Sequence, residues 1–303
     1  MTASRAAEDD PGAGHSRGLT SSRPPYRGLE RYTESDDDAA LFFGRDSELE
    51  VAAANLLAVR LTVLYGPSGA GKSSFLRAGL VHRLRRTTAT EPSDLGAPGT
   101  IVVVLDEWLG DPAAELWRAV AGAARSAEAG ARAELGERSL HDALRSLSET
   151  LNVEFLIVMD QFEDYLAAHP PGSGDRLEAE LPGLVADRDV PVRFLISLRD
   201  DALAGLDRFK GRIPDLFDNY LRLDRLGENA AREAIEGPVR HWNSVSPEPM
   251  ELEEGLVDEV LRQLVGGDAA VPTAATPVGG AQIEPAHLQL VMTRVWEAET
   301  ETG

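Results

Sequence analysis

The sequence of 303 residues contains no cysteine, which excludes disulfide bonds, thiolate metal sites and a cysteine nucleophile. It also has no run of about 18 apolar residues, the length that a transmembrane helix requires. The amino-terminal stretch 1–18 mixes acidic and basic side chains and has no apolar centre, so it is not a secretory signal. From these absences we expect a cytoplasmic protein that does not enter a membrane.

Positive charge is also scarce. Lysine and arginine total 30 residues against 51 aspartates and glutamates, which gives a net charge of −21 at pH 7. A field of this sign repels the phosphates of nucleic acids and lipids, so nucleic acid is disfavoured as a partner. The basic stretch HRLRR at 82–86 falls where a helix should end, and cations are favourable at a helix carboxyl terminus. We interpret it as a helix end, and a local nucleic-acid patch is the alternative.

Hydrophobic residues make up 43% of the chain, and many of them occur in short runs rich in β-branched side chains. Such runs predict buried strands, and helical patterns separate them. Strands that alternate with helices predict an α/β fold with a parallel sheet covered by helices on both faces. The predicted strands lie at 60–65, 101–105, 155–159, 194–198 and 220–226.

The stretch YGPSGAGKSS at 65–74 follows the first predicted strand and contains Lys72, one of only two lysines in the chain. It matches the P-loop pattern G-x-x-x-x-G-K-[ST], whose glycines let backbone N–H groups point at a phosphate. The following helix would add its positive amino-terminal end, and Lys72 would reach the β- and γ-phosphates. The flanking strand and helix argue against a chance match in a glycine-rich loop. The predicted phosphate-binding residues are Gly66, Pro67, Ser68, Gly69, Ala70, Gly71, Lys72, Ser73 and Ser74.

Carboxylates follow the apolar strand at 155–159. Asp160 stands at the strand end, where P-loop ATPases place the carboxylate that holds Mg²⁺, and the Ser73 hydroxyl is the second predicted magnesium ligand. Either Glu163 or Asp164 would activate the attacking water, and we favour Glu163. The alternative is an ordinary strand followed by a helix with solvated acids. Together with the P-loop, these residues predict an ATPase that converts ATP and water to ADP and phosphate.

Arg199 ends the predicted strand at 194–198, where a guanidinium could contact the γ-phosphate. The alternative is a salt bridge to Asp200, Asp201 or the Asp160 cluster. This residue is therefore a third candidate for the catalytic set.

The strand at 101–105 comes between the P-loop strand and the acidic strand in the chain. An extra strand that separates these two in the sheet is typical of P-loop proteins that activate their own water, and 101–105 is our candidate. The chain has no [NT]-K-x-D motif, and Lys210 cannot supply one. We therefore expect an adenine nucleotide and not a guanine nucleotide.

Three regions follow from these patterns. Residues 1–24 are rich in glycine, serine, proline and charge, and are predicted to be a disordered tail. Residues 25–227 carry the strand–helix alternation and are predicted to form the P-loop nucleotide-binding domain. Residues 228–303 contain helical patterns without strands and predict a small all-helical domain with a flexible insert at about 266–282.

Several segments in combination resemble the STAND class of signalling ATPases, most closely the bacterial novel STAND NTPase domains. These proteins belong to the AAA+-like branch of the ASCE division of P-loop ATPases. The resemblance extends over residues 25–300 and implies a P-loop domain followed by a helical lid domain. It rests on PYRGLERYTESDDDAALFFGRDSELE, VLYGPSGAGKSSFLRAGL, LIVMDQFEDYL, FLISLRDD and EPAHLQLVMTRVWE.

The resemblance adds residues and a biological role. It implies that Phe43, Gly44 and Arg45 wrap the adenine and that Pro285 of the lid lies near the nucleotide. Family members are switches in which ADP holds a closed monomer and ATP permits oligomerisation, often in defence or stress signalling. Because no sensor repeat or effector module is recognisable, the trigger and response would come from separate or fused partners, and the final ETETG suggests a fragment.

Other classes of function remain open at this stage. The chain could be a non-catalytic scaffold in which bound nucleotide only stiffens the fold. It could also be an AAA+ ATPase that acts on nucleic acid, although its charge argues against this. A small-molecule kinase is a further alternative, for which no acceptor motif is visible.

Overall fold

The computed structural model describes residues 24–90, 99–126, 139–267 and 282–302. The predicted tail, apart from its last residue, and positions 268–281 of the predicted insert at about 266–282 lie outside these described residues. Within them, no helix combines the length and the apolar character needed to cross a bilayer.

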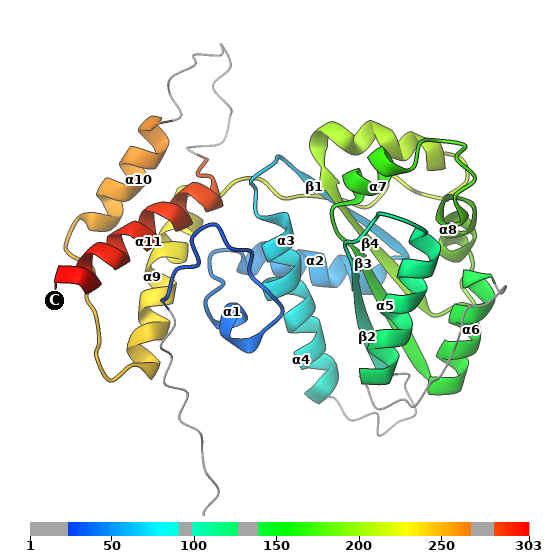
Figure 1. Ribbon diagram of the computed structural model, residues 1–303, viewed down its shortest axis with the longest axis horizontal. Helices are drawn as coiled ribbons and strands as arrows, with labels where there is room; N and C mark the ends of the chain where they lie inside the picture. The colour runs from blue at the N-terminus through cyan, green and yellow to red at the C-terminus, as the bar shows by residue number, and fades with distance from the viewer. Residues whose placement is uncertain (1–23, 91–98, 127–138, 268–281, 303) are drawn as a thin grey trace, which may run out of the picture.

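A five-stranded parallel sheet lies at the centre of the described structure, in the order β2-β3-β4-β1-β5 (Figure 1). This arrangement confirms the predicted α/β P-loop fold. The strands are β1 (Leu61–Gly66), β2 (Gly99–Leu105), β3 (Val153–Met159), β4 (Val192–Arg199) and β5 (Tyr220–Arg222).

The prediction that the strand at 101–105 separates the P-loop strand from the acidic strand was wrong. The P-loop strand β1 and the acidic strand β3 are separated by β4, whereas the predicted 101–105 strand, β2, lies at the sheet edge. The burial of the two strands gives the reason: β4 is buried without interruption from Phe194 to Leu198, whereas β2 begins with exposed and half-buried residues. A strand with two neighbours and two covered faces needs the more continuous apolar run.

Helices cover both faces of the sheet because successive strand residues point in opposite directions. On β3, Phe155 and Ile157 face a core shared with α5, α6, α7 and α8, whereas Leu156 and Val158 face a core shared with α2 and the helical stretch after β1. The covering helices are α2 (Asp46–Ala58), α3 (Lys72–Ser74) continuing through a π-helical stretch (Phe75–Val81) into α4 (His82–Thr90), α5 (Pro112–Ser126), α6 (Leu140–Leu151), α7 (Phe162–Ala168) and α8 (Arg176–Ala186).

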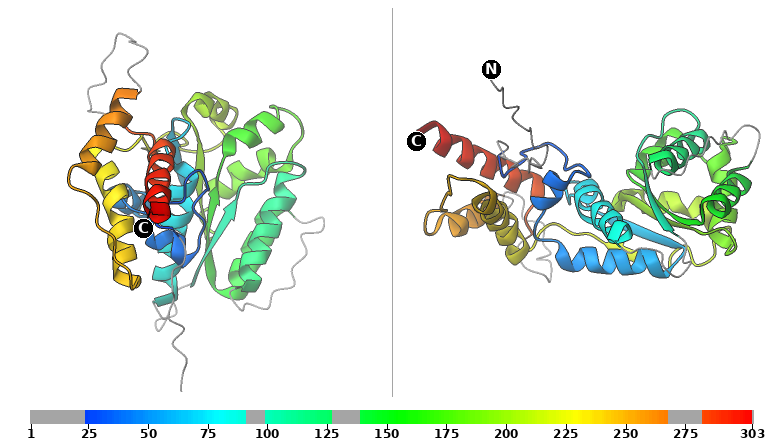
Figure 2. Two further views of the ribbon diagram at one scale, coloured as in Figure 1. Left: turned by 60° about the vertical axis from the view of Figure 1, so that its left-hand side comes forward. Right: turned by 90° about the horizontal axis from the view of Figure 1, so that it is seen from below.

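Three further helices pack on one another beside the sheet, and we call them the lid helices (Figures 1 and 2). They are α9 (Glu228–Val245), α10 (Leu256–Gly267) and α11 (Pro285–Thr302). Their apolar core is a cluster of its own and includes Trp296 and, from the amino-terminal segment, Tyr26. A backbone bridge joins Leu226, at the end of the P-loop region, to Ile283, just before α11.

The remaining helical pieces are α1 (Asp36–Ala40), which precedes α2, and a 3₁₀ stretch (Asp200–Phe209) that follows β4. α1 is short and is capped by the Ser35 side chain, which accepts a hydrogen bond from the Asp38 N–H. Tyr32 and Leu41, on either side of α1, pack with Ala78 of the π-helical stretch.

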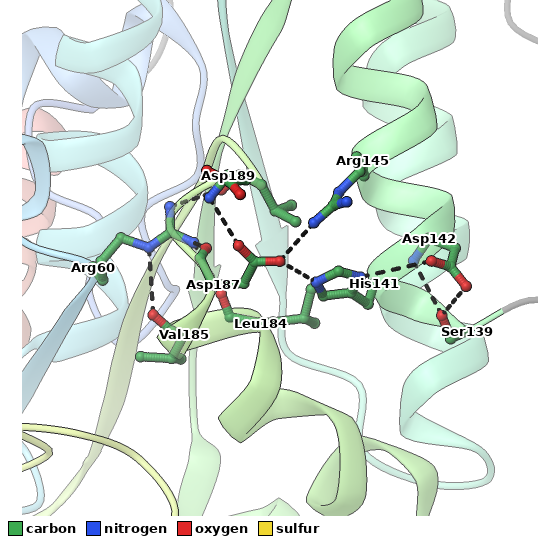
Figure 3. A network of polar contacts seen from close by, with 10 residues as sticks. Arg60, Ser139, His141, Asp142, Arg145, Leu184, Val185, Asp187 and Asp189 are labelled. Atoms are coloured by element: carbon green, nitrogen blue, oxygen red, sulfur yellow. Dashed lines mark hydrogen bonds and ion pairs between the residues drawn. The ribbon is translucent and has the colours of Figure 1, made fainter.

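A polar network closes the amino-terminal end of the sheet (Figure 3). The Asp187 carboxylate, which follows α8, lies 2.6 Å from His141 Nε2 and accepts a hydrogen bond of 2.6 Å from Arg145 on α6. Arg60, just before β1, donates to the backbone carbonyls of Leu184 at 2.9 Å and Val190 at 2.8 Å. These contacts connect the segments that precede β1 and β4, at the end of the sheet opposite to the P-loop.

Candidate functional site

The P-loop lies at the carboxyl end of β1 and turns directly into α3. Gly71 has a φ of +86°, in the left-handed region that favours glycine, and this conformation lets the loop close onto the amino terminus of the helix. Lys72 Nζ donates to the carbonyl oxygens of Gly66 at 2.9 Å and Pro67 at 3.1 Å. The ammonium is thus held at the loop by weak neutral acceptors that a phosphate could replace.

Lys72 is also surrounded by the strand-end acids. Burial lowers the pKa of Lys72, while the nearby carboxylates of Glu163 and Asp160 act in the opposite direction. The parallel order of the strands causes this proximity, because the ends of β1 and β3 meet at the same edge of the sheet.

Asp160 is 1% exposed and directly follows β3. Its Oδ1 accepts a hydrogen bond from the Gln161 N–H at 2.9 Å, and its backbone carbonyl accepts one from the Trp108 indole at 2.8 Å. Its Oδ2 is buried and has no hydrogen-bond partner among the residues that the structure describes. A buried carboxylate oxygen left without a partner fits a cation, and together with the Ser73 hydroxyl it offers the oxygen chemistry that Mg²⁺ takes.

α7 positions the two candidate catalytic acids. Its Phe162 and Tyr165 are fully buried and pack around Trp108, with ring centroids 4.6–5.4 Å apart. This anchoring leaves Glu163 on the side of the P-loop, where it is half-buried, and Asp164 exposed. Of the two acids, only Glu163 is among the residues that line the cavity described below.

The carboxylate of Glu163 accepts a hydrogen bond from the Arg199 N–H at 3.3 Å. Burial raises the pKa of Glu163 above its ordinary range, and the positive charge of Lys72 partly opposes that rise. A glutamate with a raised pKa, in the same cavity as the P-loop, is suited to accept a proton from water.

The guanidinium of Arg199 is engaged elsewhere. Its Nε and terminal nitrogen donate to the two carboxylate oxygens of Asp201 at 3.0 and 2.9 Å, and its side chain is 46% exposed. Arg199 does line the cavity, but it adopts the salt bridge that the sequence left as the alternative to phosphate contact.

The residues that the resemblance assigned to adenine have different surroundings. Phe43 lines the cavity, and its ring packs against Gly237 of α9, where an added Cβ would lie 2.4 Å from the ring. Arg45 is buried and donates to the carbonyls of Ala70 at 3.1 Å and Asp224 at 2.7 Å, and it pairs with Glu48 at 2.9 Å. Arg45 therefore connects the P-loop to α2 and to the segment after β5.

One cavity of about 350 Å³, a volume within the usual range of ligand pockets, is lined by residues 68–74 of the P-loop and by Phe43, Arg45, Asp160, Glu163 and Arg199. The predicted phosphate-binding residues Gly66 and Pro67 are not among its lining residues. Sequence reasoning missed several of its lining residues, which come from the amino-terminal segment, the strand ends and the lid helices. The only sequence signal for the first group is the PYRGLERY stretch itself. The missed lining residues are Gly28, Leu29, Glu30, Arg31, Tyr32, Leu41, Phe42, Gln161, Leu226, Ala234, Ala286, Leu288 and Gln289.

The first turn of α11 lies against the P-loop. A Cβ at Gly71 would be 3.6 Å from the Pro285 ring, and one at Gly69 would be 2.4 Å from a Glu284 carboxylate oxygen. Glu284 is in turn held by an ion pair with Arg225 at 3.2 Å. Pro285, predicted to lie near the nucleotide, does line the cavity.

The sequence profile of one family, described as novel STAND NTPase 1, matches residues 25–302. The chain belongs to this family. The match confirms the resemblance drawn from the motifs. No curated protein sequence is significantly similar to the chain.

Several solved structures share the fold of this novel STAND NTPase. The Walker-type ATPase PABY2304 of Pyrococcus abyssi superposes with a TM-score of 0.58 at 18% identity, over 88% of this chain and 70% of that one. The ORC2 protein of Aeropyrum pernix, in ADPNP and ADP complexes, has a TM-score of 0.59 at 15% identity, over 86% and 63%. The ORC1 protein of the same organism, in complex with DNA, has a TM-score of 0.55 at 17% identity, over 90% and 65%. The chain thus spans less than two thirds of the two ORC proteins, and identities this low establish the fold alone.

Gly44 offers a test of the contact between the P-loop region and the lid helices. Its φ is +84°, and an added Cβ would lie 2.2 Å from the Ala230 carbonyl of α9. Gly44→Ala should lower the free energy of unfolding through left-handed strain of about 1–2 kcal/mol plus overpacking of about 1–3 kcal/mol. Gly174→Ala is the matched control, because Gly174 has a φ of +82° and open space around it. Urea unfolding should show the larger loss at Gly44, and equal losses would contradict the close approach.

Lys72→Ala should abolish nucleotide binding, because the loop then lacks the only ammonium beside its phosphate cradle. A loss of roughly 100-fold or more in ATP and ADP affinity is expected for a charge-assisted contact to a polyanion. Isothermal titration calorimetry measures this directly. Lys210→Ala, which removes the other lysine of the chain, is the control and should bind as the wild type does. Tight ATP binding by the Lys72→Ala protein would refute the assignment of the P-loop.

Proposed function

We propose that this chain is an ATP-driven conformational switch. It binds ATP with Mg²⁺, hydrolyses the ATP slowly, and couples its nucleotide state to the position of the lid helices. One observation carries the proposal: the wall of a single cavity is built from the P-loop, the strand ends and the lid helices together. A nucleotide in such a cavity contacts both units, so its affinity depends on their relative position.

The connection between the two units supports a hinge. The lid helices have their own apolar core, and the backbone bridge between Leu226 and Ile283 pairs the residues just before α9 and α11. Glu284 and Pro285, at the start of α11, lie against Gly69 and Gly71 of the P-loop. A separately packed unit on a narrow connection is the architecture of hinge closure around a ligand.

The hydrolytic step is assigned to the acids at the strand ends. Ser73 and Asp160 would hold Mg²⁺, which neutralises the charge that develops on the phosphates. Glu163 would accept a proton from the attacking water, consistent with its raised pKa and its place in the cavity. The guanidinium of Arg199 is paired with Asp201 and not free to contact the γ-phosphate, which is consistent with slow turnover.

The signalling part of the proposal rests on family membership. As a novel STAND NTPase, the chain would oligomerise with ATP bound, in bacterial defence or stress signalling, under the control of a separate or fused sensor and effector. Cytoplasmic location fits such a role. A non-catalytic scaffold remains the alternative to a switch.

Action on nucleic acid is the other alternative, and the ORC1 complex with DNA is the observation that favours it. The net charge of −21 opposes it, because each phosphate contact requires a cation that this chain rarely supplies. Duplex DNA that accelerates phosphate release at physiological salt would shift the proposal towards that class.

Glu163→Gln should slow ATP turnover by about 10²- to 10⁴-fold, the usual contribution of a general base, and leave ATP affinity unchanged. Phosphate release measures the first quantity and calorimetry the second. Asp164→Asn is the matched control, and it should retain near-wild-type turnover because Asp164 is exposed. Because burial raises the pKa of Glu163, wild-type turnover should begin to fall on acidification at a higher pH than an ordinary glutamate would set. If only Asp164→Asn lost activity, the roles of the two acids would be reversed.

Nucleotide exchange should change the protection of the lid. We expect hydrogen exchange of the α11 amides after Pro285 to differ between the ADP state and the ATP·Mg²⁺ state of the Glu163→Gln protein. The amides of α6, beside the polar network at the far edge of the sheet, serve as an internal control and should not change. Identical exchange in both states, with no measurable hydrolysis by the wild type, would favour the non-catalytic scaffold.

A further inference from the structure

Three arginines line the cavity beside Lys72, and they differ in their partners. Arg45 is buried against Glu48 and two backbone carbonyls, and Arg199 is paired with Asp201. Arg31 has no carboxylate partner among the described residues. Its hydrogen bond, 2.9 Å long, is to the neutral side-chain oxygen of Gln161. Arg31 is thus the cavity arginine whose charge is available to an anion.

The position of Gln161 decides where that charge lies. Gln161 directly follows Asp160, the carboxylate proposed to hold Mg²⁺, and both residues line the cavity. In P-loop ATPases the magnesium ion bridges the β- and γ-phosphates, so its carboxylate marks the end of the site where the terminal phosphate lies. A guanidinium at Gln161 is therefore close to the group that distinguishes ATP from ADP.

The segment that carries Arg31 spans the two units of the molecule (Figure 2). On the lid side, Tyr26 donates to the Ile235 carbonyl at 2.8 Å, and the Arg27 N–H donates to Gln289 Oε1 at 3.0 Å. On the P-loop side, Tyr32 packs against Phe42 with ring centroids 5.6 Å apart. Arg31 thus lies between an anchor on the lid helices and an anchor beside the P-loop.

We propose that Arg31 binds the terminal phosphate of ATP and makes the cavity prefer ATP over ADP. This inference rests on the proposed function. The arginine fork matches phosphate oxygens, and a charged phosphate is a stronger acceptor than the amide oxygen that Arg31 contacts in this structure. Because the same segment is bonded to α11, the contact also links the presence of the terminal phosphate to the lid helices.

The test compares ATP and ADP affinities, measured by calorimetry with Mg²⁺, in the wild-type chain and its variants. Arg31→Ala should weaken ATP binding by about tenfold or more, the range for a charge-assisted contact, and leave ADP binding within about twofold. Arg31→Lys should restore part of the preference, because it keeps the charge and loses the fork. Arg118→Ala is the control, because the Arg118 side chain is 65% exposed on α5, pairs with Glu115 and lies outside the cavity, so its loss should change neither affinity.

Each other outcome has a defined reading. If Arg31→Ala lost ATP and ADP affinity equally, Arg31 would only maintain the shape of its segment. If neither affinity changed, Arg31 would not contact the nucleotide. Either result would overturn the inference. If the wild type bound neither nucleotide, or Lys72→Ala bound both normally, the proposed function would fail and this inference with it. Thermal unfolding checks that the Arg31→Ala protein is folded. If it is not, the ratio of ATP affinity to ADP affinity in the Arg31→Lys protein decides. A ratio below that of the wild type supports the contact, and an unchanged ratio refutes it.

Discussion

The parallel direction of all five strands is the constraint on which the site depends. It brings the carboxyl ends of β1, β3 and β4 to one edge of the sheet, so that Lys72, Asp160 and Arg199 meet although they are far apart in the chain. Each of these strands buries apolar side chains on both faces, and Asp160 and Arg199 stand where β3 and β4 leave the core. Burial of the strands and placement of the charged groups are therefore two results of the same pattern.

The lid helices add a second constraint, because the cavity is incomplete without them. Pro285 and Gln289 come from the first turns of α11, Ala234 from α9, and the intervening wall from residues 28–32. None of these elements contributes to the two cores of the sheet. The nucleotide-binding surface thus depends on packing between units whose apolar cores are otherwise separate.

The parts of this architecture that could be predicted from sequence are those whose signals are local. The P-loop and the Asp160 turn each follow an apolar run directly, so spacing alone identifies them. The place of β4 between β1 and β3 could not be predicted, because strand order depends on pairing between distant segments. The same holds for Arg31, which contacts a residue 130 positions away. For Arg199 the sequence offered the salt bridge as one of two alternatives, and the choice between them depends on side-chain geometry that the sequence does not show.

Arg45 has a mechanical consequence. Its guanidinium bonds to three segments at once: Glu48 on α2, the Ala70 carbonyl of the P-loop, and the Asp224 carbonyl of the linker between β5 and the lid helices. Because Arg45 bonds to both the P-loop and the linker, a change in the shape of the loop must either move the linker or break one of these hydrogen bonds. A ligand that changes the shape of the P-loop would therefore also shift the linker, through the guanidinium of Arg45.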